Sequence, residues 1–499
     1  MNEPKPTTAA PLEMSAAEFR ALGHDLVERL ADFLESVPAR PTAPELSPAR
    51  ARARLGGDGL PARGADAGAL LERAAEMLFD GCRLNGHPRS WGYVIGSPAP
   101  IGILGDFLAS ALNPNLAAWP GAPIPCEMEA QAVRWIADLL GYPVECGGLL
   151  TSGGNMANFI GVLAARRAHA DWDLRRAGLA PAAGRLRLYA SRETHTWLEK
   201  GADIFALGTD AIRWIATDAD LRIDTDALRA RIAADKAAGE RPFLVVGSAG
   251  TVSTGAVDPL PELAAIAREN GLWFHVDGCY GAPAVAVAGA PADLAGLRAA
   301  DYLAVDAHKW LFVPLEAGCA LVRERAALRD SFSFRPPYYH YGVDDGEVMH
   351  YHEYGPQNSR GFRALKVWLT LQRAERAGYA AMIGRNMDLA RAMAAALDAD
   401  PRFEVATQSL SITTFRYVPE DLERTAPTAA AYLNELNAAL LTRLQNGGEV
   451  FLSNAVIDGR FLLRACITNF RTGEEDVRAL PGIVARLGAA LDRELRPAR

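Results

Sequence analysis

The sequence predicts an α/β fold built on a mainly parallel sheet. Between residue 147 and about residue 322, short apolar runs alternate with helical stretches, and this alternation is typical of βαβ units. Several of these runs end in glycine, hydroxyl-bearing or charged residues. Parallel sheets bind their ligands where strands end and helices begin, so chemistry is expected at these ends. At 499 residues, the chain is long enough for two or three packed units.

The expected strands and helices divide the chain into three parts. The apolar runs place strands at 148–150, 186–190, 213–216, 243–247, 273–276, 302–305 and 318–322. After about residue 374 the chain is mainly helical, with strand candidates at 403–405, 411–417 and 461–465 and a closing helix from Glu474. This second group predicts a small α+β domain at the C-terminal end.

The N-terminal part is helical and proline-rich. Apolar residues recur every three or four positions from Phe19 to Leu34, which predicts an amphipathic helix. The proline-rich stretch 36–52 cannot continue it, and a second helical stretch follows at about 65–79. Such a segment has little of its own chain to pack on. It is either a cap on its own subunit or an arm that clasps a second subunit.

Composition excludes several classes of protein. Hydrophobic residues make up 49% and charged residues 22% of the chain, as in ordinary globular proteins. The formal charge of −8, without a basic stripe, argues against a nucleic-acid partner. The six cysteines include no CxxC pair, which favours a reduced, cytoplasmic protein without a disulfide or zinc framework. No signal peptide and no membrane-spanning apolar run is expected.

The strongest candidate for chemistry is Lys309. It lies in the segment 301–310 (DYLAVDAHKW), where an apolar strand runs into a polar turn between a histidine and a tryptophan. Burial against an apolar wall is expected to lower the pKa of this lysine and free its amine to form a Schiff base. The same neighbours also fit a lysine that packs beside a buried tryptophan and has no chemical role.

Other strand ends carry further candidates. Gly153, Gly154 and Asn155 begin a helix directly after a strand, where backbone N–H groups and the helix dipole favour a phosphate. His195 follows the strand 186–190 and fits either catalysis or stacking on a planar ligand. The hydroxyl-rich loop after 243–247 offers Thr251 or Ser253 as a hydrogen-bond partner of a cofactor. Each of these motifs alone also fits a structural role.

Asp277 ends the strand 273–276. A buried carboxylate needs a cationic partner. Asp277 therefore forms either a structural ion pair with Lys309 or a contact with the protonated pyridine nitrogen of a cofactor.

Taken in order, these motifs resemble a known family. The Gly-Gly turn, the histidine, the hydroxyl-rich loop and the segments 275–281 (HVDGCYG) and 306–310 (DAHKW) resemble the group II pyridoxal-phosphate-dependent amino acid decarboxylases, most of all those for aromatic L-amino acids. The resemblance runs from about Phe19 to Val477. It implies pyridoxal 5'-phosphate as cofactor, fold type I with a seven-stranded, mainly parallel sheet, and a homodimer with active sites at the subunit interface. It also implies a dimer-swapped helical arm (1–90), a large cofactor-binding domain (91–375) and a small C-terminal domain (376–499).

The resemblance also implies roles for single residues. Lys309 would form the Schiff base, Asp277 would pair with the pyridine N–H, and His195 would stack on the ring and orient the substrate carboxylate. The other expected cofactor contacts are Gly153, Gly154, Asn155, Thr251, Cys279 and His308. Asp306 stands where some members have a phosphate-binding asparagine, and a carboxylate there would repel a phosphate, so its role stays open.

Substrate-side residues come from three other segments. The loop after residue 331 resembles the family's catalytic loop, in which a tyrosine protonates the substrate carbon after CO2 leaves. Tyr338 is the best match and Tyr339 the second, and a tyrosine here favours simple decarboxylation over the aldehyde synthesis of relatives with phenylalanine. Tyr93, Gly96 and Ser359 resemble substrate positions, and Ser359 would face the partner's site.

The implied reaction is decarboxylation of an L-amino acid to its amine. An aromatic substrate ranks above an acidic one, because no clear extra arginine is present for a side-chain carboxylate. The alternatives are an acidic or other amino acid as substrate, an oxidative decarboxylase of the aldehyde-synthase type, another fold-type I enzyme such as an aminotransferase, and a scaffold without catalysis. His350 and His352 are too close for the HExxH arrangement, so no metal is expected.

Overall fold

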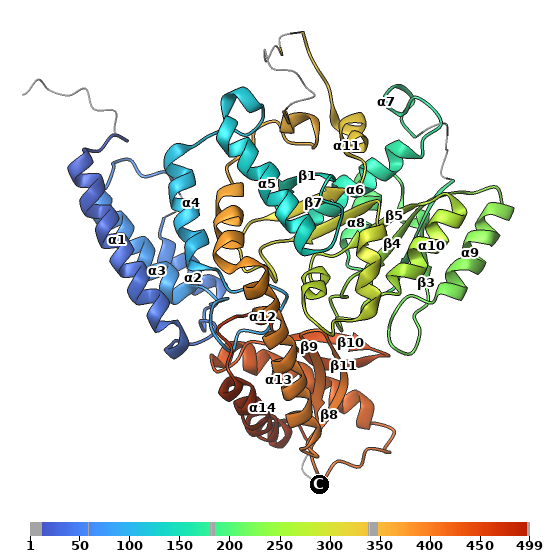
Figure 1. Cartoon of the computed structure of the whole chain (residues 1–499). Helices are drawn as coiled ribbons and strands as arrows, with labels where there is room; N and C mark the ends of the chain where they lie inside the picture. The colour runs from blue at the N-terminus through green and yellow to red at the C-terminus, as the bar shows by residue number, and fades with distance from the viewer. Residues whose placement is uncertain are drawn as a thin grey trace, which may run out of the picture.

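The structure is a computed structural model that describes residues 12–57, 59–179, 181, 185–337, 339 and 348–496. Figure 1 shows a large sheet surrounded by helices, a smaller sheet below it, and a group of N-terminal helices at one side. In the described part of the chain, no helix is both long enough and apolar enough to cross a membrane.

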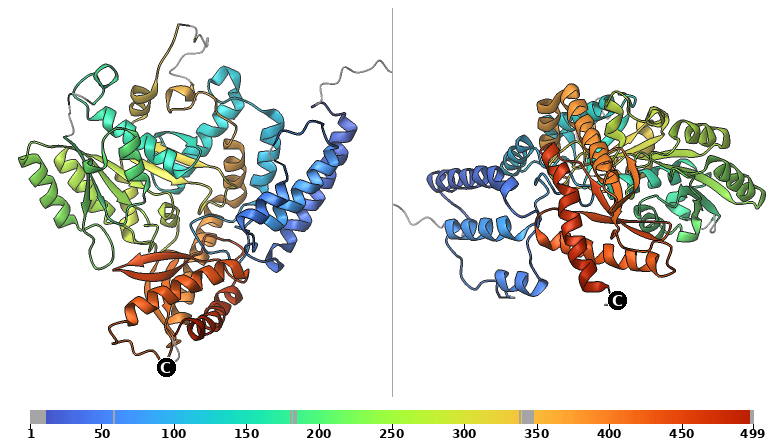
Figure 2. Two further views of the ribbon diagram at one scale, coloured as in Figure 1. Left: turned by 180° about the vertical axis from the view of Figure 1, so that it is seen from behind. Right: turned by 90° about the horizontal axis from the view of Figure 1, so that it is seen from below.

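The N-terminal helices are α1 (Ala16–Ser36), α2 (Pro48–Leu55) and α3 (Ala67–Gly81). Ser15 begins α1, and its hydroxyl accepts a hydrogen bond from the Glu18 N–H at 3.1 Å. The rings of Phe33 and Phe79 stack at 4.2 Å and join α1 to α3. Figure 2 shows these helices standing out from the rest of the molecule, and no residue of α1 is buried. Both predicted N-terminal helices are thus confirmed.

The large sheet has seven strands in the order β1-β7-β6-β5-β4-β2-β3. Their bounds are β1 (Gly147–Thr151), β2 (Leu186–Ser191), β3 (Ile212–Ile215), β4 (Arg241–Ser248), β5 (Trp273–Asp277), β6 (Tyr302–Asp306) and β7 (Gly318–Val322). Only β7 runs antiparallel to its neighbours β1 and β6, and the other described pairs are parallel. Strands buried on both faces read as continuous apolar runs, which is why all seven predicted strands are confirmed.

Helices cover the sheet. They are α4 (Pro100–Leu112), α5 (Pro123–Leu139), α6 (Gly154–Ala168), α7 (Leu174–Ala177), α8 (Trp197–Ile204), α9 (Thr225–Ala237), α10 (Leu260–Asn270) and α11 (Arg325–Phe332). The long helix α12 (Ala364–Asp398) packs on α4 and α5 and then continues to the small sheet (Figure 1). Within α12, Glu375 has a φ of 56° and interrupts the helical geometry at the expected boundary between the large and small domains. The domain boundaries themselves stay a prediction.

The small C-terminal part has an antiparallel sheet in the order β10-β11-β9-β8. Its elements are β8 (Phe403–Ser409), β9 (Ile412–Tyr417), α13 (Ala429–Gly447), β10 (Ser453–Ile457), β11 (Arg460–Cys466) and α14 (Glu474–Leu495). The three predicted strands and the closing helix are confirmed. The additional strand β10 was not predicted, because it is short and buries only alternate residues.

Candidate active site

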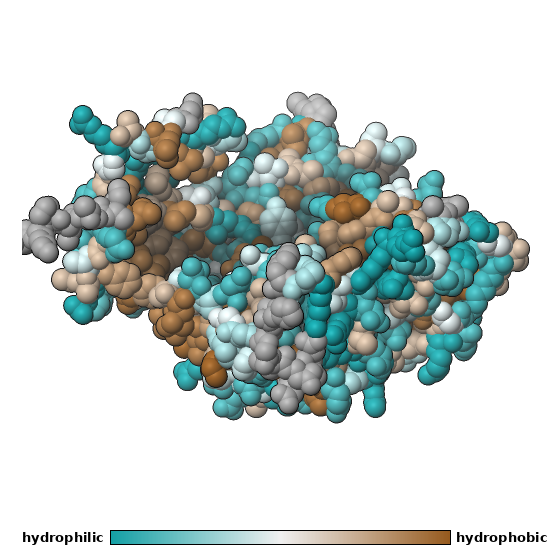
Figure 3. All heavy atoms as spheres, turned by 90° about the horizontal axis from the view of Figure 1, so that it is seen from above, coloured by the Kyte–Doolittle hydropathy of each residue, from teal (hydrophilic) through white to brown (hydrophobic). Residues whose placement is uncertain are grey.

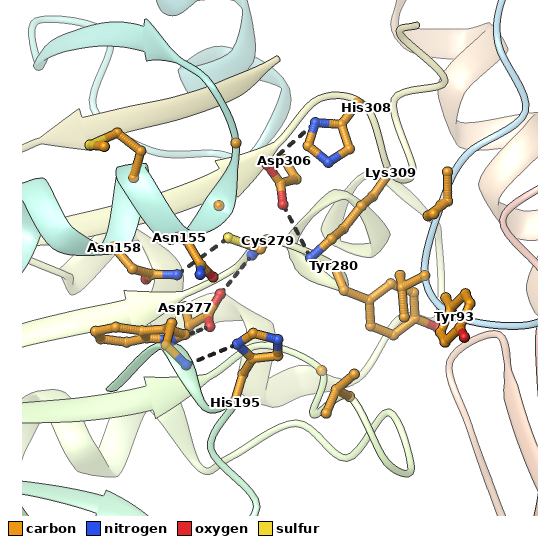
Figure 4. A pocket seen from close by; sticks show the side chains of 18 of the residues that line it. Tyr93, Asn155, Asn158, His195, Asp277, Cys279, Tyr280, Asp306, His308 and Lys309 are labelled. Carbon is orange, nitrogen blue, oxygen red and sulfur yellow. Dashed lines mark hydrogen bonds and ion pairs between the residues drawn. The ribbon is translucent and has the colours of Figure 1, made fainter. Parts of the chain in front are cut away.

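A cavity of about 690 Å³ lies where β1, β4, β5 and β6 end (Figure 4). Residues predicted from the sequence line it from several elements: Tyr93, Gly153, Gly154, Asn155, His195, Thr251, Asp277, Cys279, His308 and Lys309. The parallel topology explains this meeting, because the carboxyl ends of neighbouring strands share one edge of the sheet. Segments far apart in the sequence thus supply one site.

Lys309 follows β6 and points its amine into this cavity (Figure 4). Its Nζ lies 3.2 Å from Oδ2 of Asp306, and the two groups form an ion pair. Burial alone would lower the pKa of Lys309, but the attraction of Asp306 and that of Asp277 outweigh it. The pKa of Lys309 therefore lies above its ordinary value, and the predicted lowering was wrong.

Asp306 is almost completely buried, with 3% of its surface exposed. Its Oδ2 is the ion-pair partner of Lys309, whereas its Oδ1 lies 3.6 Å from His308 Nδ1 and has no hydrogen-bond donor among the residues that the structure describes. The carboxylate also lies against the start of α6. A Cβ at Gly154 would come within 2.5 Å of Oδ2, so only glycine leaves room for it.

Asp277 ends β5 as a half-buried carboxylate directed into the cavity (Figure 4). Its Oδ2 accepts a hydrogen bond from the indole N–H of Trp197 at 2.7 Å, and its Oδ1 accepts one from the Cys279 N–H at 3.1 Å. Burial raises its pKa, but Lys309 and the donors from Cys279 outweigh this effect and hold the pKa below its usual value. Since the ion pair of Lys309 is made with Asp306, the alternative of a structural Asp277–Lys309 pair is wrong.

His195 lies beside Asp277 at the cavity wall (Figure 4). Its Nδ1 accepts a hydrogen bond from the Trp197 N–H at 3.1 Å, which places the ring proton on Nε2. His195 is exposed to the cavity but partly desolvated there, and this desolvation lowers its pKa, so the neutral ring is favoured at neutral pH. Trp197 thus holds both His195 and Asp277, a role that sequence reasoning did not assign to it.

The remaining cofactor candidates surround these groups. Gly153 has a φ of 136°, which only glycine adopts readily, and α6 begins directly after it with backbone N–H groups that have no partner within the helix. The Thr251 hydroxyl lies 3.0 Å from that of Thr254. Burial raises the pKa of Cys279, whose thiol is therefore neutral and lies 3.6 Å from the Asn158 amide nitrogen.

Together these groups fit a cofactor with three different functional groups. The Gly-Gly turn and the N-terminus of α6 suit a phosphate. The amine of Lys309 suits an aldehyde, and the ionised Asp277 suits a protonated ring nitrogen. Pyridoxal 5'-phosphate carries all three.

The comparisons with known proteins agree with this fit. The family model described as "Pyridoxal-dependent decarboxylase conserved domain" matches residues 51–418. This chain belongs to the pyridoxal-dependent decarboxylase family. It is 33% identical to the aromatic-L-amino-acid decarboxylase of Bacillus atrophaeus over 93% of this chain and 94% of that protein. It is 28% identical to tryptophan decarboxylase 2 of Oryza sativa subsp. japonica over 93% of each.

Solved structures give the same result for the fold. The structure of Oryza sativa TDC with PLP and tryptamine has a TM-score of 0.88 and 27% identity, and the match covers 97% of this chain and 100% of that one. Mouse CSAD in its apo form, 24% identical, has the same fold with a TM-score of 0.88 over 95% and 99% of the two chains. The chain is therefore a pyridoxal-phosphate-dependent amino acid decarboxylase of fold type I.

Sequence reasoning missed an arginine of the decarboxylase's cavity. Arg464 on β11 is only 4% exposed and lines the cavity. Its Nε donates to Ser453 Oγ at 2.9 Å and its Nη1 donates to the Val252 carbonyl. Within the described ranges it has no carboxylate partner, so it is a cationic residue of the cavity that sequence reasoning did not identify. The signal was a charged residue inside the apolar run 461–466 (FLLRAC).

Two of the three residues predicted to contact the substrate do not line the cavity. Tyr93 lines the cavity, is 53% exposed, and donates its backbone N–H to Ser453 Oγ at 3.3 Å. Gly96 is not part of the lining; its N–H donates to the His308 carbonyl at 3.1 Å, and it packs on the backbone of the lysine turn. Ser359 is exposed and also lies outside the cavity. The substrate roles of Gly96 and Ser359 stay predictions.

The predicted catalytic tyrosine Tyr338 lies outside the described residues. Its alternative Tyr339 packs edge-on against the His352 ring at 5.0 Å. The rest of the cavity wall is largely apolar. It includes Val94, Ile95, Met156, Phe159 and Leu315.

Proposed function

We propose that this decarboxylase acts on aromatic L-amino acids and converts them to the matching amine and CO2. The observation that carries the proposal is one cavity whose lining combines Lys309, Asp277, His195 and Arg464 with several apolar side chains. Apolar pockets with a few convergent polar groups are typical binding sites for small ligands with a large hydrophobic part. The 33% identity to the aromatic-L-amino-acid decarboxylase of Bacillus atrophaeus supports the same substrate class.

Lys309 would hold the cofactor covalently through its amine. When bound, pyridoxal 5'-phosphate supplies an electron sink for the bond that breaks as CO2 leaves. Asp277 accepts a hydrogen bond from the ring nitrogen and keeps it protonated. The two donors from Trp197 and Cys279 hold this carboxylate ionised in its half-buried place.

The remaining cofactor contacts follow from the lining of the cavity. Gly153, Gly154 and Asn155 bind the phosphate at the start of α6. Thr251, Cys279 and His308 contact the cofactor from the loops after β4, β5 and β6.

Two basic side chains receive the substrate carboxylate. Arg464 attracts it, because a buried guanidinium without an acidic partner gains most from pairing with an anion. His195 orients it through Nε2, since its Nδ1 is engaged by the Trp197 N–H. Both side chains are held by other groups of the protein, which keeps the scissile bond in one orientation.

The substrate ring lies against the apolar wall. Tyr93, Val94 and Ile95 line one part of the cavity, and Met156 and Phe159 of α6 line another. We further propose that Tyr338 delivers a proton to the substrate carbon after CO2 leaves, a role that rests on its position in the sequence, with Tyr339 as the alternative.

We also propose that the enzyme is a cytoplasmic homodimer with its active sites at the subunit interface. Large apolar side chains are exposed along α1, α3 and α4: Phe19, Val27, Leu70, Leu71, Leu78, Leu104, Phe107, Leu108 and Leu112. Contiguous exposed apolar surface is typical of interaction sites. Figure 3 shows apolar atoms gathered on the side of the N-terminal helices, next to a hollowed face. All six cysteines are free thiols, as is usual in a reducing compartment.

The test is an assay of the purified enzyme with pyridoxal phosphate and a panel of amino acids, in which amine, CO2 and peroxide are measured together. Equal amounts of amine and CO2 from aromatic amino acids, and little from acidic ones, are expected. Turnover of glutamate or aspartate alone would contradict the substrate assignment.

The second candidate is oxidative decarboxylation to an aldehyde. Its support is a 29% identity to the phenylacetaldehyde synthase of Petunia hybrida over 90% of each chain. Peroxide and aldehyde in place of amine would establish it in the same assay.

A further inference from the structure

Asp306 touches the reactive nitrogen of the site and has no part in the mechanism above. Figure 4 shows its carboxylate joined by dashed lines to both Lys309 and His308. In the described part of the chain, no other carboxylate forms an ion pair with Lys309. Because Asp306 is buried, water screens this attraction only weakly.

Several other ionisable groups face Lys309. Asp277 and Cys279 approach from β5 and the loop after it, His195 from the loop after β2, His308 from the same turn as Lys309, and Cys466 from β11. Asp277 is held by its own donors, and Cys279 is a neutral thiol. Asp306 is therefore the direct ion-pair partner that, together with the more distant charge of Asp277, holds Lys309 as an ammonium ion.

An ammonium ion has no lone pair and cannot attack an aldehyde. Lys309 must lose a proton before it captures the cofactor, and the nearest base is Asp306 Oδ2 at 3.2 Å, within hydrogen-bond reach. We propose that Asp306 stores Lys309 as an ammonium ion in the cofactor-free enzyme and takes its proton when the phosphate of the cofactor arrives. This inference rests on the proposed role of Lys309.

The arriving phosphate supplies the driving force. Asp306 lies at the start of α6, the place suited to a phosphate, and its Oδ2 would be 2.5 Å from a Cβ at Gly154. Two anions at one helix start repel each other. Transfer of a proton from Lys309 Nζ to Asp306 relieves this repulsion and frees the amine in the same step. The repulsion between the phosphate and the Asp306 carboxylate therefore drives the deprotonation of Lys309.

The step balances in atoms and charge. One proton passes from the ammonium group of Lys309 to Oδ2 of Asp306, and the released lone pair forms the bond to the aldehyde carbon. The two remaining amine hydrogens leave with the aldehyde oxygen as water, and a C=N bond remains. Among the described residues, Asp306 Oδ1 has no hydrogen-bond donor.

The experiment measures cofactor capture by the cofactor-free full-length protein, not turnover. Stopped-flow absorbance follows formation of the covalent bond as a function of pH with two probes, pyridoxal phosphate and pyridoxal. In the wild type, the pH of half-maximal capture rate is expected to be lower with pyridoxal phosphate than with pyridoxal.

Asp306→Asn removes the carboxylate beside the amine of Lys309. The pH of half-maximal capture rate with pyridoxal is then expected to fall by about 1 to 3 pH units, because a neighbouring opposite charge shifts the pKa of an amine by that amount. The gap between the two probes closes. Asp306→Ser serves as the second variant if Asp306→Asn folds poorly. The matched control is Asp106→Asn, which removes a carboxylate 3.0 Å from the amine of Lys366 and is expected to change neither quantity.

The inference is overturned if the pH profiles of cofactor capture by both Asp306 variants coincide with those of the wild type. It is also overturned if the pH of half-maximal capture still differs between pyridoxal phosphate and pyridoxal in these variants. Lys309→Ala separates this failure from that of the proposed function. If Lys309→Ala still forms the covalent bond, the assignment of Lys309 fails; if it does not and the Asp306 variants behave as the wild type, only the role of Asp306 fails.

Discussion

The substitution Gly96→Ala tests how closely the substrate-side segment is packed on the reactive lysine. A Cβ at residue 96 would lie 2.0 Å from the carbonyl oxygen of Lys309 and 3.0 Å from its carbonyl carbon. Ordinary van der Waals contacts begin at 3.4 Å, so the two backbones must move apart by more than 1 Å. Both neighbours are backbone atoms, so rotation of a side chain cannot relieve the contact.

A displacement of about 1 Å in a catalytic group costs roughly 100-fold in rate. Gly96→Ala is therefore expected to lower kcat by about 100-fold and to lower the free energy of unfolding by about 1 to 3 kcal/mol, as overpacked positions do. The assay is steady-state release of CO2, with thermal unfolding measured in parallel. If Gly96 were a substrate contact instead, KM would rise while kcat stayed near the wild-type value.

The matched control is Gly482→Ala in α14, where a Cβ would meet nothing within 4 Å. It should keep full activity and stability. Activity of Gly96→Ala within about twofold of the wild type would contradict this prediction, because a 2.0 Å contact leaves no room for an unchanged lysine turn.

Three further predictions concern the substrate, the proton donor and pH. Arg464→Met is expected to raise KM by about 10- to 150-fold, as the loss of a charged hydrogen bond does. The inhibition constant of the product amine, which lacks the carboxylate, should stay unchanged. An equal rise in KM and in this inhibition constant would contradict the assignment. Tyr338→Phe should keep the cofactor's absorbance and lose amine yield, with Tyr339→Phe as the control; unchanged amine yield would remove Tyr338 from this role. Burial lowers the pKa of His275 to about 4, below the ordinary value of 6.5. Between these two pH values the unfolded chain binds a proton that the folded protein does not. The free energy of unfolding is therefore expected to fall by about 3 kcal/mol as the pH falls from 6.5 to 4. Denaturant titrations of the wild type and His275→Gln check this, and equal slopes with pH would contradict it.

The sequence was most informative where local pattern decides the structure. The strands of the large sheet are buried on both faces, so their apolar runs predict them without tertiary information. The candidate residues at their ends meet in one cavity because parallel strands share an edge. The short strand β10 escaped prediction because only alternate residues of Ser453–Ile457 are buried.

Distances between side chains could not be predicted in the same way. The pKa of Lys309 depends on Asp306, which lies three residues earlier and which a turn folds back to 3.2 Å. Trp197 follows His195 closely in sequence, yet its contact with Asp277 bridges 80 residues. Arg464 reaches the cavity only because β11 of the small sheet lies against it. Each of these contacts follows from the tertiary arrangement and leaves only a weak local signal.

The most direct test of the account is to locate the cofactor on the chain. The holoenzyme is treated with borohydride, which fixes the cofactor's bond to its lysine, and is then digested and analysed by mass spectrometry. The account predicts the reduced cofactor on the peptide that contains Lys309. A label on Lys366, Lys200 or another lysine, with Lys309 unmodified, would contradict it.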